Sequence, residues 1–105
     1  MRRILSNSRL EQAVAGGIRY QSPNCRQIQA ARVALGWSQQ DLADKAEVGV
    51  ASVSRLEALP ESAEPMDNLR PSTISRIVAV FEAQGIEFLY YEDPGRLGVS
   101  FPRKR

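Results

Sequence analysis

Side chains that commonly carry catalysis or hold metal ions are scarce in this chain. It contains no histidine and a single cysteine, Cys25. Histidine is the commonest metal ligand and the usual acid–base group near neutral pH, and one cysteine cannot close an internal disulfide. Serine, tyrosine and carboxylate side chains are present, but without a paired base or a phosphate-binding glycine loop. We therefore expect no enzymatic activity, no cofactor and no metal site, and we interpret Cys25 as a small residue near a helix start.

Acidic residues gather in one short segment. Residues 60–71 contain three prolines together with Glu61, Glu64 and Asp67. Closely spaced carboxylates can bind a cation, but no histidine, cysteine or glycine-containing calcium-loop pattern accompanies them. We therefore predict a solvated acidic loop with room for one helical turn.

Charge is unevenly distributed along the chain. Residues 1–35 hold six arginines and one glutamate, residues 36–95 hold four basic and eleven acidic residues, and residues 96–105 hold four basic and no acidic residues. The net charge of +2 thus combines basic ends with an acidic middle. Basic ends either attract nucleic acid in a salt-sensitive way or simply keep the chain soluble. The terminal charges concerned are Arg2, Arg3, Arg9, Arg19, Arg103, Lys104 and Arg105.

The length of 105 residues suits one compact domain. No apolar run approaches the roughly 20 residues that a membrane span needs. The basic start, Met1 to Leu5, is followed by polar residues where a signal peptide requires an apolar stretch. We therefore expect a cytoplasmic protein that has no membrane segment.

Three short helices are expected between residues 24 and 59. Asn24 and Gln27 form a plausible capping box for the first helix, and Ser38 caps the second, with Asp41 in its first turn. The third helix ends before Pro60. The apolar positions at helical spacing are Ile28, Ala31 and Leu35, then Leu42, Ala43 and Ala46, then Val53 and Leu56.

A fourth helix and a hairpin complete the expected fold. Ser72 is the predicted cap of the helix, and Gly85 is its stop. Alternating apolar residues then flank Asp93-Pro94-Gly95, which predicts a hairpin over residues 86–102. A lone hairpin is marginal in water, so it must lie on the helical core or pair with a second copy. The fold class is mainly α, a bundle of four to five helices with a small C-terminal β-hairpin. Its expected parts are an N-terminal arm (1–22), the helical domain (23–85), the hairpin (86–102) and a basic tail (103–105).

The segment from Ile28 to Glu57 resembles the phage repressor and Cro type of helix-turn-helix, the xenobiotic-response-element family. The resemblance covers about a third of the chain. The hairpin also looks like the one that ends many short bacterial members. The matching pieces are Ala31-Arg32, the run from Leu35 to Ala43 (Leu-Gly-Trp-Ser-Gln-Gln-Asp-Leu-Ala), and Ser52 to Glu57 (Ser-Val-Ser-Arg-Leu-Glu).

The resemblance implies specific roles for residues of the unit. It implies an internal ion pair between Arg32 and Glu57. The third helix would enter the major groove, where an arginine can form two parallel hydrogen bonds with guanine and small apolar side chains can contact a thymine methyl. The implied base contacts are Val50, Ala51 and Arg55, and the expected phosphate contacts are Gln39, Ser52 and Ser54. Two positions depart from the pattern: Glu47 stands where glycine is usual, and Gly49 where serine or threonine is usual.

These observations lead to one functional expectation and one rival. We expect a sequence-specific regulator of transcription that binds double-stranded DNA, a repressor acting as a homodimer on a two-fold operator. The expected dimer surface on the hairpin is Leu89, Tyr90, Val99 and Phe101. The rival is a protein-binding module, like an antiactivator or antitoxin, that uses the helix-turn-helix fold to restrain another regulator or a toxin. Two observations motivate it: the recognition unit lacks an excess of positive charge, and Glu47 adds a negative charge.

Overall fold

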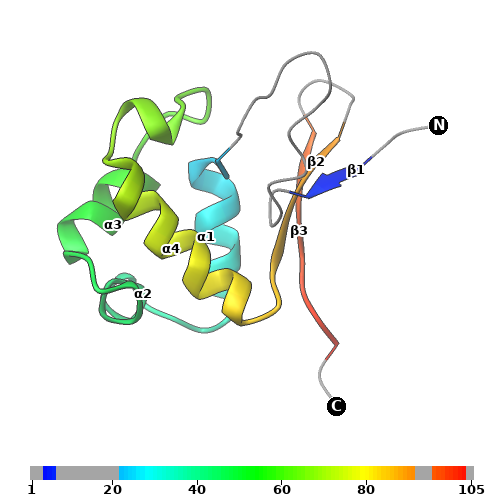
Figure 1. Ribbon diagram of the computed structural model, residues 1–105, viewed down its shortest axis with the longest axis horizontal. Helices are drawn as coiled ribbons and strands as arrows, with labels where there is room; N and C mark the ends of the chain where they lie inside the picture. Colours follow the sequence, from blue (N-terminus) through cyan, green and yellow to red (C-terminus); the bar gives the residue numbers. More distant parts are fainter. Residues whose placement is uncertain (1–3, 7–21, 92–95, 104–105) are drawn as a thin grey trace.

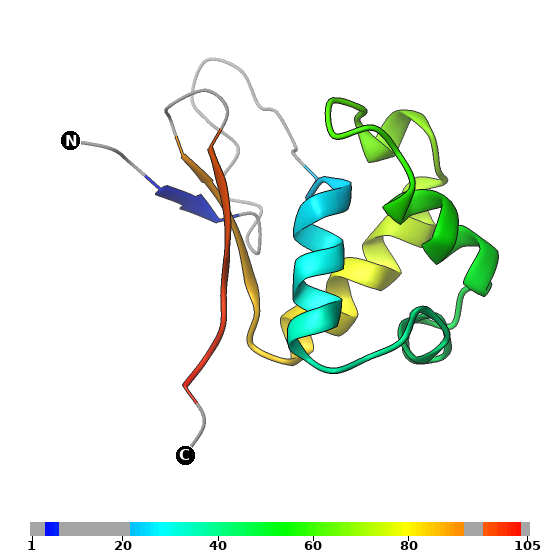
Figure 2. The same ribbon diagram turned by 180° about the vertical axis from the view of Figure 1, so that it is seen from behind.

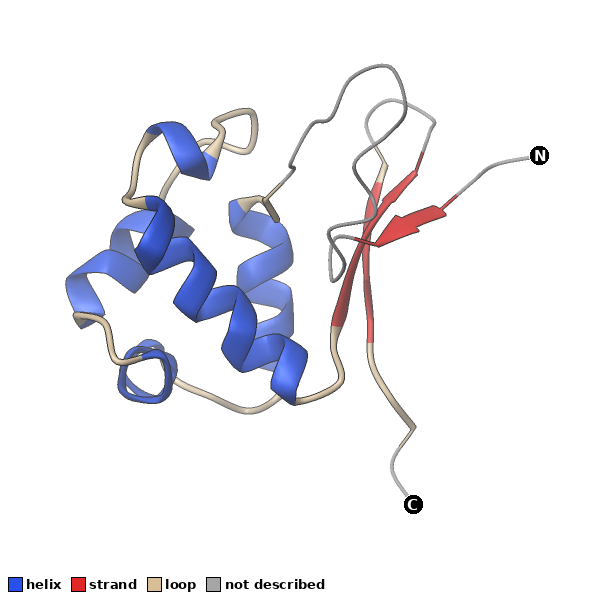
Figure 3. Ribbon diagram, viewed as in Figure 1, coloured by secondary structure: helices blue, strands red, loops and turns tan. Residues whose placement is uncertain are grey.

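The computed structural model describes residues 4–6, 22–91 and 96–103. Within these ranges the helices gather on one side of an antiparallel sheet (Figures 1 and 3). The helices are α1 (Cys25–Ala34), α2 (Gln39–Ala46), α3 (Val50–Glu57) and α4 (Pro71–Ala83), with a short 3₁₀ helix, η2, at Pro65–Asp67. The strands are β1 (Ile4–Ser6), β2 (Glu87–Tyr91) and β3 (Leu97–Ser100). The prediction of a mainly helical bundle with a small C-terminal hairpin is confirmed.

The first two helices begin at the capping boxes that the sequence predicts. The side chain of Asn24 accepts from the backbone N–H of Gln27, whose own side chain accepts from the N–H of Asn24, both at 3.0 Å. Ser38 and Asp41 repeat this arrangement at the start of α2. Each box satisfies two N–H groups that a helix start leaves without partners.

The beginning of α4 differs from the prediction. Arg70 is the N-cap and Pro71 is the first helical residue, so Ser72 is not the cap. Proline suits this first position because its fixed φ is helical and its missing N–H would have no partner there. The capping pattern at Ser72 was outweighed by the proline that precedes it.

The core lies between the four helices and the inner face of the sheet. Phe81 of α4 is at its centre: Phe88 of β2 meets its ring edge-on at a centroid distance of 5.7 Å, and Trp37 stacks on it at 5.9 Å. Trp37 is half-buried, and because its ring stacks on Phe81 it covers α4. The residues buried in the helices include Ile28, Ala31, Leu42, Val53, Leu56, Ile74 and Ile77. Among residues 4–6, 22–91 and 96–103, the helices are too short or too polar for a membrane-spanning segment.

The hairpin lies on the helical core, the first of the two alternatives left open by the sequence. The alternating apolar residues face inward and are buried: Ile86, just before β2, and Phe88 and Tyr90 within it. Gln27 of α1, also buried, donates through its side-chain amide to the carbonyl oxygens of Leu89 (3.2 Å) and Gly98 (2.9 Å). Strand β3 runs beside α1 (Figure 2), and the hairpin is thus fixed to α1 by hydrogen bonds as well as by packing.

A third strand joins the hairpin. The sequence predicted only an arm over residues 1–22, but Ile4–Ser6 forms β1, which pairs antiparallel with β2 so that the strand order is β1-β2-β3. Residues 1–3, 7–21, 92–95 and 104–105, which hold the rest of the arm, the predicted hairpin turn and most of the predicted basic tail, lie outside the described residues. Within the described sheet, β2 is the central strand and β3 is an outer strand.

The four residues expected to form one dimer surface are separated by the sheet. Tyr90 is only 5% exposed and belongs to the protein's own core, so its assignment to a dimer surface is wrong. Leu89 pairs with Gly98, whereas Val99 pairs with Phe88. Side chains alternate between the faces of a sheet, which places Leu89 on the opposite face from Val99. Phe101, one residue beyond β3, lines the same groove as Val99. Only Val99 and Phe101 remain together.

Candidate nucleic-acid interface

The outward face of α3 carries side chains that neither pack into the core nor pair with other described residues. Val53 and Leu56 turn inward and are fully buried. Val50, Ala51, Ser54 and Arg55 are exposed, and no hydrogen bond or ion pair of their side chains is formed within the described part of the chain. The three residues implied as base contacts therefore share one accessible surface. Arg55 is the only charged side chain among them.

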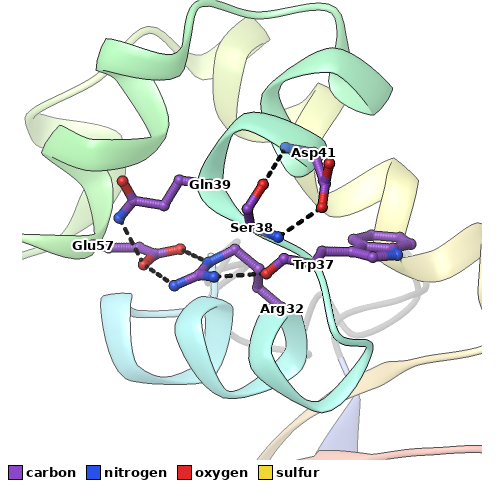
Figure 4. Close-up of polar contacts among 6 residues, drawn as sticks. All are labelled: Arg32, Trp37, Ser38, Gln39, Asp41 and Glu57. Carbon is purple, nitrogen blue, oxygen red and sulfur yellow. Dashed lines mark hydrogen bonds and ion pairs between the residues drawn. The ribbon is translucent and has the colours of Figure 1, made fainter.

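A buried ion pair holds α3 to α1. The guanidinium group of Arg32 donates to both carboxylate oxygens of Glu57, from Nε at 2.6 Å and from Nη2 at 2.9 Å (Figure 4). The two side chains are 13% and 4% exposed. Nη1 of Arg32 also donates to the carbonyl oxygen of Trp37 at 2.7 Å. Arg32 is thus occupied by the fold, as the resemblance implies, and is not available to DNA.

Gln39 joins this network, which sequence reasoning missed. Its side-chain amide donates to Glu57 Oε1 at 3.1 Å (Figure 4). Gln39 is the first residue of α2 and is half-buried. An amide nitrogen has two N–H groups, so one remains for a phosphate oxygen while the other is held by Glu57. No local pattern links residues 39 and 57, and the contact appears only when α2 and α3 pack together.

Two pKa shifts follow from these contacts. The hydrogen bonds to Glu57, together with its negative charge, raise the pKa of Arg32 above its usual value. The backbone N–H of Ser38 donates to the carboxylate of Asp41 at 2.9 Å and lowers the pKa of Asp41. Both groups are therefore charged at neutral pH. The negative charge of Asp41 lies in the first turn of α2, where it complements the positive end of the helix dipole.

The turn between α2 and α3 contains a strained residue, Glu47, at a position where glycine is usual in the family that the segment resembles. Helices α1, α2 and α4 end in the same way, with a residue in the left-handed conformation followed by an N–H that donates back to the carbonyl five positions earlier, at 3.0–3.1 Å. Gly36 and Gly85 occupy the left-handed position after α1 and α4. After α2 it is Glu47, with φ 58° and ψ 46°. Glycine is the usual residue there because it has no Cβ.

We expect Glu47→Gly to raise the free energy of unfolding by about 1 kcal/mol, because a left-handed residue with a Cβ costs about 1–2 kcal/mol and glycine loses more chain entropy on folding. Urea denaturation measures the change. The control is Glu47→Gln, which removes the charge and keeps the Cβ. An equal gain in both variants would assign the effect to the charge and not to the backbone.

The remaining candidate residues are placed differently from one another. Ser54 is exposed on the outer face of α3, whereas Ser52 is half-buried on the side toward α4. Cys25 is the first residue of α1; it is buried, and its thiol donates to the carbonyl oxygen of Leu59 at 3.1 Å. Its interpretation as a small structural residue is therefore consistent with its surroundings.

Two carboxylates of the acidic loop make contacts with residues at and just before the start of α1. Glu61 pairs with Arg26 at 2.9 Å on the surface, and Glu64 accepts a hydrogen bond from the hydroxyl of Ser22. Within the described ranges, no three side chains of histidine, cysteine, aspartate or glutamate come together in a way that could hold a metal ion. The helical turn expected in this loop is η2.

Part of the chain is similar to a known family. Residues 28–65 match the family model described as Helix-turn-helix. The matched segment includes most of α1, all of α2 and α3, and the loop up to Pro65. This segment is a helix-turn-helix unit. The match supports a DNA-binding regulator, and no curated protein and no solved structure matches the chain.

The helix-turn-helix unit has an unusual charge for a DNA-binding element. Residues 28–65 contain three basic residues, Arg32, Lys45 and Arg55, against six acidic ones. One of the three is neutralised by Glu57. The ammonium group of Lys45 lies 4.9 Å from the centre of the Trp37 ring. Within the unit, Arg55 is therefore the one positive side chain that projects from the outward face of α3.

Proposed function

We propose that this protein is a sequence-specific regulator of transcription that binds double-stranded DNA through its helix-turn-helix unit. The observation that carries the proposal is the outward face of α3, whose side chains are accessible and unpaired in the described structure. A helix fits the major groove of B-DNA, and the residues near its N-terminus then face the base edges. Arg55 supplies a guanine contact, and Val50 and Ala51 supply apolar contacts with thymine methyl groups. Gln39, Ser54 and Ser52 are the proposed phosphate contacts.

Selection from random DNA tests this proposal. Recovered duplexes should share a sequence with a conserved guanine in each half-site, and the protein should prefer them to unrelated duplexes by roughly 10³-fold or more at moderate salt. A failure to retain any duplex, even at low salt, would reject the proposal.

We further propose that the regulator is a repressor that acts as a homodimer. Exposed large apolar side chains support the choice of surface. Four are found in the described residues: Val33, Val50, Leu97 and Phe101, which are 59%, 39%, 41% and 44% exposed. Val50 belongs to the outward face of α3. Leu97 and Phe101 line a groove of about 470 Å³ between α1 and β3, and Val33 lies one turn beyond Ala30, which also lines it.

This groove is the proposed dimer surface because it combines exposed apolar residues with an outer strand of the sheet. Val99 is also part of its lining, so Val99 and Phe101 remain in the proposed surface. A second copy of the chain, related by a two-fold axis, would bury the same residues of both protomers. Two α3 helices would then face two half-sites about one turn of DNA apart.

We expect the double variant Leu97→Glu/Phe101→Glu to be monomeric, because two charges on each protomer would be desolvated in the interface. Sedimentation velocity measures the change. The control is Val50→Glu, which introduces a charge at a similarly exposed apolar residue outside the groove and should remain dimeric. A dimer that persists in the double variant would place the interface elsewhere.

A second candidate function is that of a protein-binding module that restrains another regulator or a toxin. The net charge of the helix-turn-helix unit favours it, because three basic and six acidic residues are a poor match for a polyanion. This candidate predicts a stable complex with a basic protein and no retention of duplex DNA. The selection experiment therefore distinguishes the two functions directly.

A further inference from the structure

The helix-turn-helix unit does not contain the positive charge that a phosphate backbone requires. Much of the affinity for DNA comes from contacts between basic side chains and phosphates. The unit has three basic residues against six acidic ones, so the positive charge must come from other segments of the same chain. After residue 65, the next basic residues in the described structure are Arg70 and Arg76, both exposed.

These two arginines lie at a cleft beside α3. The cleft has a volume of about 250 Å³ and is formed by the turn before α3, the N-terminal half of α3 and the first turns of α4. Its polar lining comprises Glu47, Ser52, Arg70, Ser72, Thr73 and Arg76. The lining thus combines two guanidinium groups with three hydroxyls, which is the donor chemistry that binds phosphate oxygens.

Both arginines retain donors for a ligand. The side chain of Arg70 forms no hydrogen bond or ion pair within the described residues, although its backbone carbonyl accepts from α4. Arg76 uses one N–H of its guanidinium group to bond the carbonyl oxygen of Glu47 at 3.2 Å. A guanidinium group has five N–H donors, so this bond positions Arg76 at the cleft without exhausting it.

The position of the cleft relative to α3 suits the two walls of a DNA groove. Successive residues of a helix are about 100° apart, so Glu57 and Ser52 lie on opposite sides of the buried stripe formed by Val53 and Leu56. Glu57 accepts from Gln39, which marks the α2 side of α3. Ser52 lines the cleft, which marks the α4 side. Gln39 and the cleft therefore flank α3 on opposite sides.

We propose that the cleft between α3 and α4 binds the phosphate backbone of double-stranded DNA, with Arg70 and Arg76 as the charged contacts. This inference rests on the proposed function. When α3 occupies the major groove, which is about 12 Å wide, the two phosphate backbones run along its two flanks. Gln39 contacts one backbone, and the cleft contacts the other. Glu47, whose carboxylate also belongs to the lining, opposes this contact.

The test compares charge-neutralised variants of the full chain by fluorescence anisotropy on a duplex recovered by selection and on an unrelated duplex of equal length. We expect Arg70→Gln to weaken binding to both duplexes about equally, by roughly tenfold, and to reduce the salt dependence of log K by about 0.9 for each phosphate that the variant no longer neutralises. Arg76→Gln should behave in the same way. Glu47→Gln should strengthen binding to both duplexes.

Arg26→Gln is the matched control, since it also removes one exposed arginine charge, but from the start of α1 beside Glu61. It should leave the salt dependence unchanged, and sedimentation velocity verifies that its oligomeric state is that of the wild type, because Arg26 also lines the groove proposed as the dimer surface. A second arm replaces single phosphates of the selected duplex with methylphosphonate. One replacement should weaken wild-type binding and have no further effect on Arg70→Gln.

The outcomes separate the cleft from the proposed function. If the wild-type protein prefers the selected duplex while Arg70→Gln and Arg76→Gln match Arg26→Gln in affinity and salt dependence, the cleft is rejected and the function stands. If the wild-type protein binds no duplex, both are rejected together. Thermal melting verifies that each variant is folded. Arg70→Gln alone decides the matter if Arg76→Gln is unstable, because the Arg70 side chain makes no hydrogen bond or ion pair in the described structure that the fold needs.

Discussion

Replacement of Arg32 by alanine is expected to lower the free energy of unfolding by about 3–5 kcal/mol, enough to unfold many domains of this size at physiological temperature. The variant removes both charge-assisted bonds from Glu57 and the bond to the carbonyl of Trp37. Glu57, with a side chain only 4% exposed, would keep Gln39 as its one partner in the described structure. A buried carboxylate without a cation is among the most destabilising changes that a single substitution can cause.

Two further variants show whether burial is the cause. Arg26→Ala breaks the Arg26–Glu61 pair, whose side chains are 70% and 62% exposed, and should cost at most about 1 kcal/mol because solvent screens exposed pairs. Arg32→Met combined with Glu57→Met removes both buried charges and should recover much of the stability. Urea denaturation provides all three values. A decrease for Arg32→Ala no larger than that for Arg26→Ala would contradict a structural role for the buried pair.

Replacement of Arg55 by alanine is expected to abolish recognition of one guanine in each half-site while the fold remains intact. The side chain is exposed and unpaired in the described structure, so the melting temperature should not change. Loss of a bidentate bond to guanine should cost about 1–3 kcal/mol of discrimination in each half-site. Competition binding with duplexes that differ at single base pairs measures this directly.

Gln39→Ala is the contrasting variant for Arg55→Ala. A phosphate contact positions the protein without reading bases, so binding to all duplexes should weaken alike. The variant also removes a hydrogen bond to Glu57 and should cost about 1 kcal/mol of stability. Unaltered base preference in Arg55→Ala would show that α3 does not read the sequence, and the protein-binding module would then be the better account.

The parts of the fold that could be predicted from the sequence are those with local causes. Asn24 with Gln27 and Ser38 with Asp41 each form a capping box within four residues, so their patterns are complete in the sequence. The start of α4 was predicted less well because Ser72 and Pro71 are competing local signals for a helix start. Strand β1 was not predicted at all, since three residues have no periodicity and their partners in β2 lie more than 80 residues away.

The candidate site divides in the same way. The outward face of α3 could be predicted from helical geometry alone, because it is the face opposite the apolar stripe of Val53 and Leu56. The bond between Gln39 and Glu57 and the cleft with Arg70 and Arg76 arise where separate helices meet, so no spacing in the sequence indicates them. Tyr90 illustrates the converse error, because an alternating strand does not reveal whether its apolar face meets its own helices or another molecule.

The dual attachment of α1 bears on the length of DNA that a dimer can recognise. Gln27 holds the hairpin and, five residues later, Arg32 holds α3, so the two attachments are about 7.5 Å apart along one rigid helix. In a dimer built on β3, each reading helix is connected to the interface through the rigid helix α1 and not through a flexible linker, so the distance between the two reading helices is fixed. Each inserted base pair rotates one half-site by about 34–36° relative to the other. Such a dimer would hold its two reading helices at one fixed separation and would recognise operators of a single half-site spacing.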